Sequence, residues 1–406
     1  MPQSYIKRIL DARVYDVARE TPVDQAALMS RRLDNRVWLK REDLQPVFSF
    51  KLRGAYNKMN CLSDEQRAKG VVAASAGNHA QGLAMAADKM KVKAIIVMPR
   101  TTPQIKVDAV RDRGAKVILH GDSYDEAAAH AAKLVEEKGM TYVHPFDDPD
   151  VIAGQGTVGM EIVRQHEQPL DAIFVPVGGG GLLAGVAAFV KYVWPQTRVI
   201  GVEPEDAACL KLALEKGRRA VLPEVGLFAD GCAVAQVGKE TFRVVKNLVD
   251  EVITVGTDEM CAAIKDIFED TRSIAEPAGA LALAGLKHYV EREGAQGQDL
   301  LAIVSGANTN FDRLRYISER TEIGEKREAV LAVTIDEKPG SFKSFCTAMQ
   351  KRNISEFNYR YSDTSRAHIF VGAQVSGDED RHQLVQDLRS KGYQVADMTD
   401  NEVAKM

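Results

Sequence analysis

The most constraining feature of this chain is an alternation, beginning near residue 70, of short apolar runs with longer amphipathic stretches. Near-continuous apolar strands separated by helices predict parallel sheets that are buried on both faces. We therefore expect an α/β fold with two doubly wound units, whose ligand lies in a cleft beyond the carboxyl ends of the strands. The expected strands are residues 70–74, 93–98, 116–119, 142–143, 172–177, 198–202, 251–255 and 300–304, and the expected helices are 78–90, 103–113, 123–138, 182–193, 258–269 and 277–293.

The pattern changes after a charged stretch at residues 319–327. The last part of the chain reads strand, helix, strand, strand, helix, strand, an order typical of a ferredoxin-like βαββαβ unit. Its expected elements are residues 329–335, 341–351, 354–361, 368–375, 380–391 and 393–397. No cluster of reactive side chains falls within it, so a sensor or an interface module is expected. The predicted division is an α/β part at residues 1–320 with a smaller subdomain at about 45–145, a linker at 321–327 and a small domain at 328–406.

Composition limits the kinds of partner. The 406 residues carry a formal net charge of -4 and no long basic run, so neither nucleic acid nor an anionic membrane is expected as a partner. No apolar run is long enough to cross a bilayer, and the first residues lack the apolar stretch of a secretory signal. The five cysteines are far apart and never form a C-x-x-C pair, which favours reduced thiols in a cytoplasmic protein.

Two side chains near expected element ends have the right chemistry for a reactive site. Lys51 lies between Phe50 and Leu52 ahead of an expected helix, where burial would lower its pKa and make it a nucleophile toward an aldehyde. Ser305 follows the strand at 300–304, and its hydroxyl could bond a ring nitrogen without adding a charge. Taken alone, Lys51 is more typical of a solvated surface lysine, and Ser305 is as typical of an ordinary strand-end turn.

Two further segments offer backbone N–H groups at the start of a helix, a place suited to anions. One follows the strand at 70–74 and suits a carboxylate, although Asn78 could instead be a simple helix cap. The other is a run of four glycines before the helix at 182–193, and it suits a phosphate. Glycine costs about 0.5–1 kcal/mol in regular structure, so such a run indicates close approach of the backbone to another group. The residues are Ser75, Ala76, Gly77, Asn78 and His79 in the first segment, and Gly178, Gly179, Gly180, Gly181 and Leu182 in the second.

The glycine run also permits a different interpretation. Gly179, Gly181 and Ala184 fit the loose dinucleotide pattern G-x-G-x-x-A, and Glu203 ends the next strand, where a carboxylate could bind a ribose hydroxyl. A nicotinamide-dependent dehydrogenase is therefore an alternative. It leaves Lys51 and the segment around Asn78 without a role.

Four segments, in this order along the chain, resemble those of fold-type II pyridoxal-phosphate enzymes. Within that group they are most similar to the threonine and serine dehydratase branch. The segments are S-F-K-L-R-G, S-A-G-N-H-A-Q-G, G-G-G-G-L and S-G-A-N. The likeness covers about residues 5–320. The tail, with P-G-S-F at 339–342 and E-F-N-Y-R at 356–360, is similar to the ACT-like regulatory domain of the same family. The resemblance implies a tryptophan synthase β-like catalytic part that uses pyridoxal 5′-phosphate. It further implies a lyase that converts L-threonine and L-serine to 2-oxobutanoate or pyruvate and ammonia, the first committed step of isoleucine biosynthesis.

The resemblance also implies a role for each matching residue. Lys51 is expected to form the Schiff base and to act as the general base. Asn78 is expected to bond the 3-hydroxyl of the cofactor and Ser305 its ring nitrogen. Its phosphate is expected to lie on Gly178, Gly179, Gly180, Gly181 and Leu182, and the substrate carboxylate on Ser75, Ala76, Gly77, Asn78 and His79.

Two positions depart from relatives in this branch. Serine racemases have a second serine where this chain has Ala76, so racemisation is not expected. Those relatives also bind a divalent cation near the position of Glu203, but here the residue six positions later is Cys209. The eight histidines show no ligand spacing either, so no metal is expected.

A third alternative is a non-catalytic amino-acid sensor on the same fold. The intact Lys51 conflicts with it, because a sensor would not need the reactive amine.

Regulation through the C-terminal domain is a further implication of the resemblance, with isoleucine as inhibitor and valine as activator. The turn at 339–342 opens an expected helix, whose free N–H groups could hold an amino-acid carboxylate. Phe342, Phe357 and Tyr359 could then contact a branched side chain. The alternative is that Phe342 belongs to the core and Tyr359 to an interface. The resemblance also implies that this protein forms a homodimer or a homotetramer.

Overall fold

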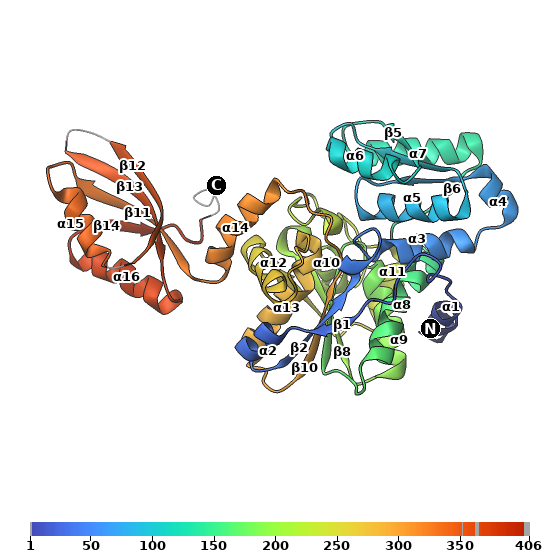
Figure 1. Ribbon diagram of the computed structural model, residues 1–406, viewed down its shortest axis with the longest axis horizontal. Helices are drawn as coiled ribbons and strands as arrows, with labels where there is room; N and C mark the ends of the chain where they lie inside the picture. The colour runs from blue at the N-terminus through green and yellow to red at the C-terminus, as the bar shows by residue number, and fades with distance from the viewer. Residues whose placement is uncertain (1, 351, 362–364, 402–406) are drawn as a thin grey trace. The chain divides into compact units, whose positions relative to one another are not determined.

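The computed structural model of the protein describes residues 2–350, 352–361 and 365–401. The chain forms two units (Figure 1), Met1–Gly256 with Asp266–Asn310, and Thr257–Lys265 with Phe311–Met406. The sequence predicts a boundary after residue 320, whereas the smaller unit of the structure already includes the chain from Phe311 onward. The reason is that helix α14 (Arg313–Gly324) packs within the smaller unit on the start of α12 (Thr257–Thr271), where Arg320 Nε lies 2.5 Å from Asp258 Oδ1. Residues 321–324 of the predicted linker are therefore the last turn of a helix.

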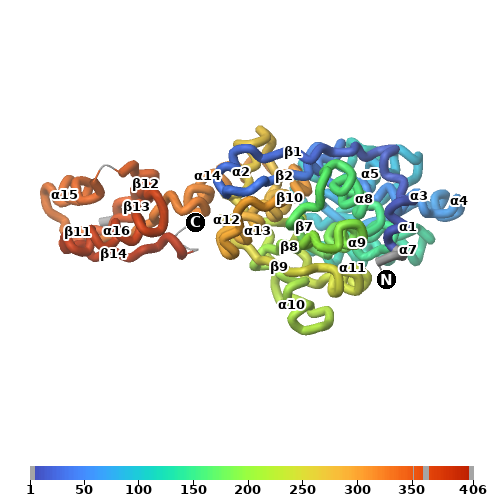
Figure 2. The backbone as a smooth tube through the Cα atoms, turned by 90° about the horizontal axis from the view of Figure 1, so that it is seen from below, coloured from blue at the N-terminus to red at the C-terminus, as the bar shows by residue number. Residues whose placement is uncertain are grey.

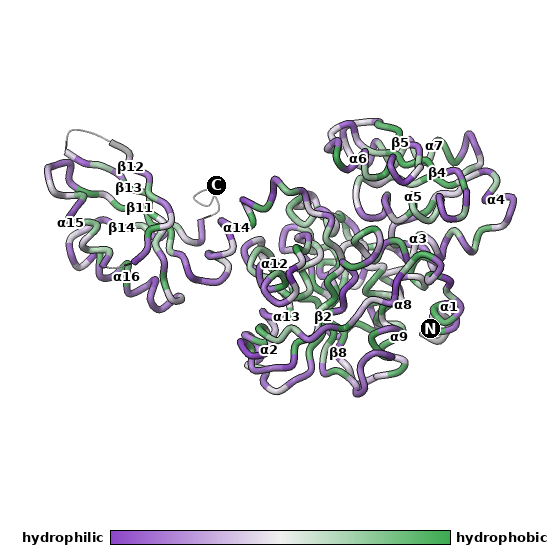
Figure 3. Tube along the Cα trace, viewed as in Figure 1, coloured by the Kyte–Doolittle hydropathy of each residue, from purple (hydrophilic) through white to green (hydrophobic). Residues whose placement is uncertain are grey.

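Six strands form one sheet of the larger unit, in the order β1-β2-β10-β7-β8-β9. Neighbouring strands are parallel, except that β1 runs antiparallel to β2. Figure 3 shows hydrophobic residues concentrated in the interior of the larger unit, where β7, β8 and β10 are almost wholly buried, as expected for strands covered on both faces. The strands are Val23–Gln25 (β1), Arg36–Arg41 (β2), Ala172–Pro176 (β7), Arg198–Pro204 (β8), Glu251–Val255 (β9) and Asp299–Val304 (β10).

Helices cover both faces of this sheet, as is usual where parallel strands are buried on both sides. Helix α13 (Pro277–Glu293) packs on β7 and β10, while α8 (Pro149–Gln165) and α9 (Gly181–Val193) lie on the opposite face (Figure 2). The other short elements of this unit are α1 (Pro2–Leu10), α2 (Ala27–Leu33), α10 (Cys209–Glu215), α11 (Lys239–Val245) and the 3-10 turns η1 (Glu42–Leu44), η2 (Glu205–Ala207) and η3 (Asp230–Cys232).

A second, wholly parallel sheet has the order β5-β4-β3-β6 and forms a smaller subdomain. Its strands, and its helices other than the short one at residues 64–69, fall within a few residues of the segments that the sequence predicts. They are β3 (Val71–Ala74), β4 (Ala94–Met98), β5 (Lys116–Leu119), β6 (Thr141–Tyr142), α4 (Asp64–Lys69), α5 (Asn78–Met90), α6 (Gln104–Arg111) and α7 (Tyr124–Lys138).

The smaller unit contains the βαββαβ order that the sequence predicts. Its antiparallel sheet has the strand order β12-β13-β11-β14 and packs its helices around Phe345, Leu384 and Leu388. The elements are β11 (Glu328–Asp336), α15 (Ser341–Ala348), β12 (Ile354–Tyr361), β13 (Arg366–Gln374), α16 (Asp378–Ser390) and β14 (Gln394–Asp397). Lys351, the predicted end of the first helix, lies outside the described residues.

Helix α3 (Lys51–Asn60) packs closely against helices on two sides. On the α5 side, a Cβ at Gly82 would lie 2.8 Å from the Leu52 nitrogen. On the α8 side, a Cβ at Gly154 would lie 2.4 Å from the Arg53 carbonyl oxygen. Both positions therefore require glycine, and α3 has little freedom to shift.

A buried cluster of charges holds the same helix. The Arg53 guanidinium lies 2.7 Å from a Glu42 oxygen and 2.5 Å from a Glu161 oxygen, and Lys40 Nζ lies 2.6 Å from the other Glu161 oxygen. All four side chains are fully buried. Two positive and two negative groups balance, so the cluster avoids the large cost of an unpaired buried charge.

Replacing Arg53 with Met should destabilise the protein strongly, because Glu42 and Glu161 would stay buried without their main partner. Breaking a buried pair in this way typically costs about 3–5 kcal/mol, measurable by chemical denaturation. Arg8→Met is the matched control, since Arg8 is half exposed in its pair with Asp150 and should matter much less. Equal losses in the two variants would contradict a special contribution from the buried cluster.

Candidate active site

The loops that follow β3, β7 and β10 meet the start of α3 at one pocket of about 1070 Å³ in the larger unit. Parallel sheets place ligands at these carboxyl ends of strands. The pocket is lined by every residue that the sequence places at the cofactor and the carboxylate, namely Lys51, Ser75, Ala76, Gly77, Asn78, His79, Gly178, Gly179, Gly180, Gly181, Leu182 and Ser305.

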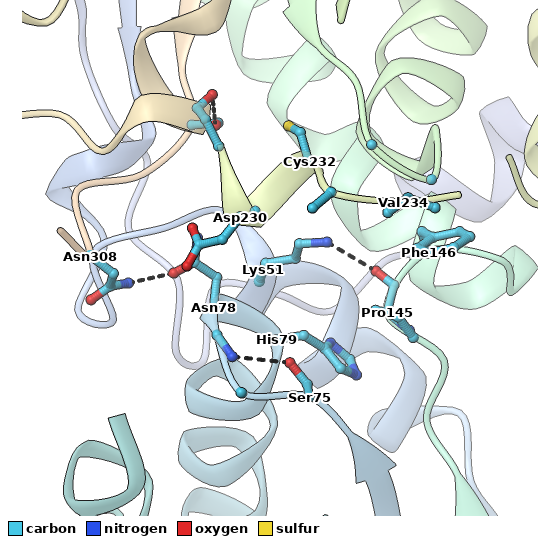
Figure 4. Close-up of a pocket in the computed structure, with 18 of the residues that line it drawn as sticks. Lys51, Ser75, Asn78, His79, Pro145, Phe146, Asp230, Cys232, Val234 and Asn308 are labelled. Atoms are coloured by element: carbon cyan, nitrogen blue, oxygen red, sulfur yellow. Dashed lines mark hydrogen bonds between the residues drawn. The ribbon is translucent and has the colours of Figure 1, made fainter. Parts of the chain in front are cut away.

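Lys51 is the first residue of α3, and its amine projects into the pocket (Figure 4). Nζ donates a hydrogen bond to the Pro145 carbonyl oxygen at 3.4 Å and lies 5.2 Å from the centre of the Phe50 ring. Burial lowers the pKa of the Lys51 amine to about 8, because the ammonium form loses its hydration. A useful share of this amine is therefore unprotonated, and nucleophilic, near neutral pH.

Residues 75–79 connect β3 to α5 and line one wall of the pocket. The N–H groups of Ala76, Asn78 and His79 donate no hydrogen bond to the described residues, whereas the Gly77 N–H donates to Ser75 Oγ at 3.3 Å. The N-terminal dipole of α5 adds to the attraction for a negative group. This wall is thus suited to a carboxylate.

The His79 imidazole lies beside Lys51 and is almost completely buried. Its Nε2 lies 2.8 Å from the Val143 carbonyl oxygen, which can only accept, so the ring proton is on Nε2. Burial, together with the charge of Lys51, lowers the pKa of His79 to about 3. The ring is therefore neutral and does not compete with Lys51 for protons.

The four glycines connect β7 to α9 and present a row of N–H groups. Across the described residues, no acceptor meets the N–H groups of residues 178–183. Gly180 has φ +88°, and a Cβ at Gly179 would lie 2.3 Å from the Phe146 ring. Glycine is thus required both by backbone conformation and by close packing. A row of N–H groups at a helix N-terminus suits a phosphate.

This loop is supported by residues that the sequence did not identify. The Gly179 carbonyl oxygen accepts from Thr241 Oγ1 at 2.7 Å. The Asp147 carboxylate in turn accepts from the N–H groups of Lys239 and Glu240, at 2.8 and 2.7 Å. Asp147 and Thr241 are more than ninety positions apart in the chain, so no local sequence pattern could pair them.

Ser305 follows β10, and its loop pairs with the residues just before α3. The Phe50 N–H donates to the Ser305 carbonyl oxygen at 3.2 Å, and the Ala307 N–H donates to the Phe48 carbonyl oxygen at 2.9 Å. The Ser305 hydroxyl donates to the Ala278 carbonyl oxygen at 3.3 Å, a long bond that it can exchange for another partner. The short antiparallel contact ties the end of β10 to the Lys51 end of α3.

Asn78 is held by Asn308, the last residue of the S-G-A-N segment, and by Glu276, which no sequence pattern identified. Its Nδ2 donates to Glu276 Oε1 at 2.6 Å, and its Oδ1 accepts from Asn308 Nδ2 at 2.7 Å. Glu276 directly precedes Pro277 and occupies the N-cap position of α13, where serine, threonine, aspartate and asparagine are preferred. That unusual residue at a helix start is the signal that could have identified it.

The Glu203 carboxylate is bound by backbone N–H groups of the protein itself. It accepts from the N–H groups of Leu210 and Lys211, at 2.8 and 2.9 Å, at the start of α10. This use of both oxygens removes the support for a ribose site there. The Cys209 thiol donates to the Gly178 carbonyl oxygen at 3.5 Å. Within the part of the chain that the structure describes, no three His, Cys, Asp or Glu side chains gather as a metal site would require.

In the smaller unit, the aromatic residues predicted for an effector lie on neighbouring elements. The rings of Phe342 and Phe357 are 5.0 Å apart at an angle of 67°. Phe342 is 47% exposed, so it is not a core residue. The Tyr359 hydroxyl donates to Glu337, and Gly340, with φ +93°, caps the start of α15.

Known proteins share both parts of this architecture. Residues 14–306 match the pyridoxal-phosphate dependent enzyme family, and residues 319–406 match the C-terminal regulatory domain of threonine dehydratase. The biosynthetic L-threonine dehydratase of Burkholderia multivorans is 59% identical over 99% of this chain and 80% of its own length. The chain belongs to the biosynthetic threonine dehydratases. The corresponding Escherichia coli protein is 54% identical over 99% of this chain and 78% of its own length. The processed form of threonine deaminase isoform 2 from Solanum lycopersicum has a TM-score of 0.77 and 50% identity, and the match covers 79% of this chain and 93% of that one.

The pocket of this threonine dehydratase fits the cofactor of its family. Pyridoxal phosphate presents an aldehyde, a phosphate and a ring nitrogen, and it is met here by a buried amine, a row of N–H groups and a serine hydroxyl. The predicted cofactor and lyase class are confirmed, and the nicotinamide alternative is wrong. No helix among the described residues has the length and apolar character needed to cross a membrane.

In the cofactor-free protein, Lys51 should react with pyridoxal phosphate with a pH dependence set by its own pKa. Because burial lowers that pKa to about 8, the rate of capture should rise with pH up to about 8 and then level off. An ordinary lysine, with a pKa of about 10.4, should continue to gain reactivity. Borohydride trapping with peptide mapping measures both, and Lys91, with a side chain 80% exposed, is the internal control. Parallel profiles for the two lysines would contradict the lowered pKa.

Proposed function

We propose that this threonine dehydratase converts L-threonine to 2-oxobutanoate and ammonia, and L-serine to pyruvate and ammonia, as the first committed step of isoleucine biosynthesis. The observation that carries the proposal is the position of Lys51. Its buried amine, with a pKa lowered to about 8, shares one pocket with N–H groups suited to a phosphate and others suited to a carboxylate. The intact Lys51 also argues against a non-catalytic sensor.

Four parts of the chain would hold the cofactor. Lys51 would bind its aldehyde carbon, Asn78 its 3-hydroxyl and Ser305 its ring nitrogen, while residues 178–182 would bind its phosphate. When bound, pyridoxal phosphate withdraws electrons from the substrate, which makes the Cα proton acidic and lets the β-hydroxyl leave. Ser305 adds no negative charge at the ring nitrogen, which suits β-elimination.

The substrate would be oriented by residues 75–79 and deprotonated by Lys51. Ser75 and the free N–H groups of Ala76, Asn78 and His79 would receive its carboxylate. The Lys51 amine would take the Cα proton as general base, a role for which a pKa near the operating pH is well matched. Ala76 has no hydroxyl to return a proton, so elimination is favoured over racemisation. The water lost at Cβ is regained when ammonia is released by hydrolysis.

We assign these catalytic roles to residues 1–320 and regulation to residues 328–406, joined at 321–327. The family matches at 14–306 and 319–406 support that division. We also propose a cytoplasmic homodimer or homotetramer. The cytoplasmic location is supported by the five free cysteines, which suit a reducing compartment.

Replacing Lys51 with Ala should lower the rate of 2-oxobutanoate formation by at least about 10²–10⁴-fold, the usual contribution of a general base. The variant should keep its fold, as circular dichroism can verify, because removing a buried amine leaves no unpaired charge. Lys91→Ala, on the surface, is the control. Retention of more than a tenth of the wild-type rate by the Lys51 variant would exclude this mechanism.

We further propose that the smaller unit binds isoleucine as an inhibitor and valine as an activator. Gly340 ends the turn before α15, whose first N–H groups can hold an amino-acid carboxylate. Phe342 and Phe357 form a half-exposed aromatic pair beside that turn, and Tyr359 lies two residues further along the same strand as Phe357. This arrangement offers apolar contact for a branched side chain.

Replacing Phe342 with Ala should weaken isoleucine inhibition, since the effector would lose an aromatic contact that contributes to the coupling. Such coupling is typically about 1–3 kcal/mol, or roughly 5–150-fold in affinity. Inhibition curves, each normalised to the effector-free rate of that variant, measure the change. Phe268→Ala is the matched control, because Phe268 is similarly exposed at 41% but lies on α12. Unchanged isoleucine sensitivity in the Phe342 variant would place the effector elsewhere.

A further inference from the structure

Glu276 is a buried carboxyl group that lines the pocket and has no part in the reaction proposed above. It is only 3% exposed, and both of its oxygens are used. Oε1 accepts from Asn78 Nδ2 at 2.6 Å, and Oε2 accepts from the Asn308 N–H at 3.0 Å. No lysine or arginine forms an ion pair with it in the described part of the chain. Hydrogen bonds from neutral groups therefore hold the Glu276 side chain in the wall of the pocket.

The surrounding backbone leaves room for this carboxyl group. A Cβ at Gly306 would lie 2.5 Å from Glu276 Oε1, closer than any side chain could approach it. The Glu276 N–H also donates to the Gly306 carbonyl oxygen at 3.1 Å. Burying a carboxyl group costs free energy unless the group is hydrogen-bonded. A pocket wall that is shaped around such a group therefore indicates that Glu276 has a function there.

Its partner Asn78 needs a fixed orientation. An asparagine amide can present either its oxygen or its nitrogen to a ligand, and only the nitrogen donates a hydrogen bond. Here one N–H of Asn78 bonds to Glu276, and Oδ1 is occupied by Asn308 Nδ2 at 2.7 Å. The second N–H of Asn78 is then left for a group in the pocket. Asn308 Nδ2 is itself held by the Val47 carbonyl oxygen at 2.9 Å, so Asn308 and Glu276 restrain the same amide orientation from two sides. Loss of Glu276 would remove the restraint on the donor side of the Asn78 amide.

We propose that Glu276 is a positioning residue for the 3-hydroxyl of pyridoxal phosphate, which fixes the donor of Asn78 and couples its own protonation to that oxygen. This inference rests on the role proposed for Asn78. It concerns residues that are far apart in the sequence and meet only in the folded pocket.

Glu276 can change its charge near neutral pH. Burial, together with the negative charge of Asp230 on η3, raises the pKa of Glu276 to about 7, against the opposing hydrogen bonds from Asn78 and Asn308. The other charged or titratable groups that face it are Lys106 on α6, Lys51 on α3 and Cys232 on η3. Glu276 is therefore neutral below about pH 7 and ionised above it.

The two charge states should act differently on Asn78. An ionised Glu276 is the stronger acceptor and draws the Asn78 amide toward itself, so the second N–H donates less strongly to the cofactor oxygen. A neutral Glu276 leaves that N–H a better donor. Raising the pH through about 7 should therefore change the proton affinity of the cofactor hydroxyl, which the visible absorption of the bound cofactor reports.

Absorption spectra of the holoenzyme across neutral pH test the proposal without measuring turnover. The wild type should show a one-proton change in the visible band near pH 7, and Glu276→Gln should lose it. Glu203→Gln is the matched control, because burial also raises the pKa of Glu203 to about 7, yet Glu203 bonds to Leu210 and Lys211. It should keep the change. A flat wild-type profile, a change that persists in Glu276→Gln, or its loss in Glu203→Gln would overturn the inference.

Asn78→Ala separates this inference from the proposed function. The variant should shift the visible band itself, and an unaltered band would overturn the role of Asn78 and with it the proposed site. A shifted band in Asn78→Ala, combined with an intact pH change in Glu276→Gln, would overturn the inference alone. If Glu276→Gln does not fold, Glu276→Asp serves in its place, since it withdraws the carboxyl group from Asn78 by one methylene. Persistence of the wild-type pH change in that variant would also overturn the inference.

Discussion

The position of the reactive amine depends on a group of charges that never meets the ligand. Lys51 and Arg53 are two residues apart on α3, so their side chains leave nearly opposite sides of the helix. Lys51 enters the pocket, while Arg53 is held by Glu42 and Glu161 in a fully buried cluster. Close helix contacts at glycines on two sides of α3 leave it no room to slide. The amine is therefore placed by ion pairs on the far side of its own helix.

Burial gives the pocket a second property, because it shifts its titratable groups toward their neutral forms. It lowers the pKa of Lys51 to about 8 and that of His79 to about 3, and it raises the pKa of Glu276 to about 7 and that of Cys232 to about 12. The free backbone N–H groups at 75–79 and 178–183 add partial positive charges that do not depend on pH. These N–H groups favour anions, and they are not amines that could compete with Lys51 for the cofactor aldehyde.

The sequence predicted those parts of the structure whose residues carry their own signal. Strands such as β3 and β7 are apolar because both faces are buried, and the glycine run is unusual wherever it lies. Strand β2 was missed, because its buried residues include Lys40 and Arg41, which do not read as core until their partners are known. The contact between Glu276 and Asn78 spans 198 positions, and nothing local in the sequence could reveal it. Prediction failed where a polar residue is buried by a distant partner.

The two rows of N–H groups belong to different sheets, and this has a consequence for binding. The row at 75–79 follows β3 of the smaller sheet, and the row at 178–183 follows β7 of the larger sheet. An ion pair of 2.5 Å between Lys106 on α6 and Asp230 on η3 also joins the two subdomains at the pocket. A ligand that carries a phosphate and a carboxylate at a fixed separation therefore bonds both sheets at once. The binding free energy of such a ligand depends on the spacing of the two sheets. Any change in that spacing therefore changes both the affinity for the ligand and its alignment with Lys51.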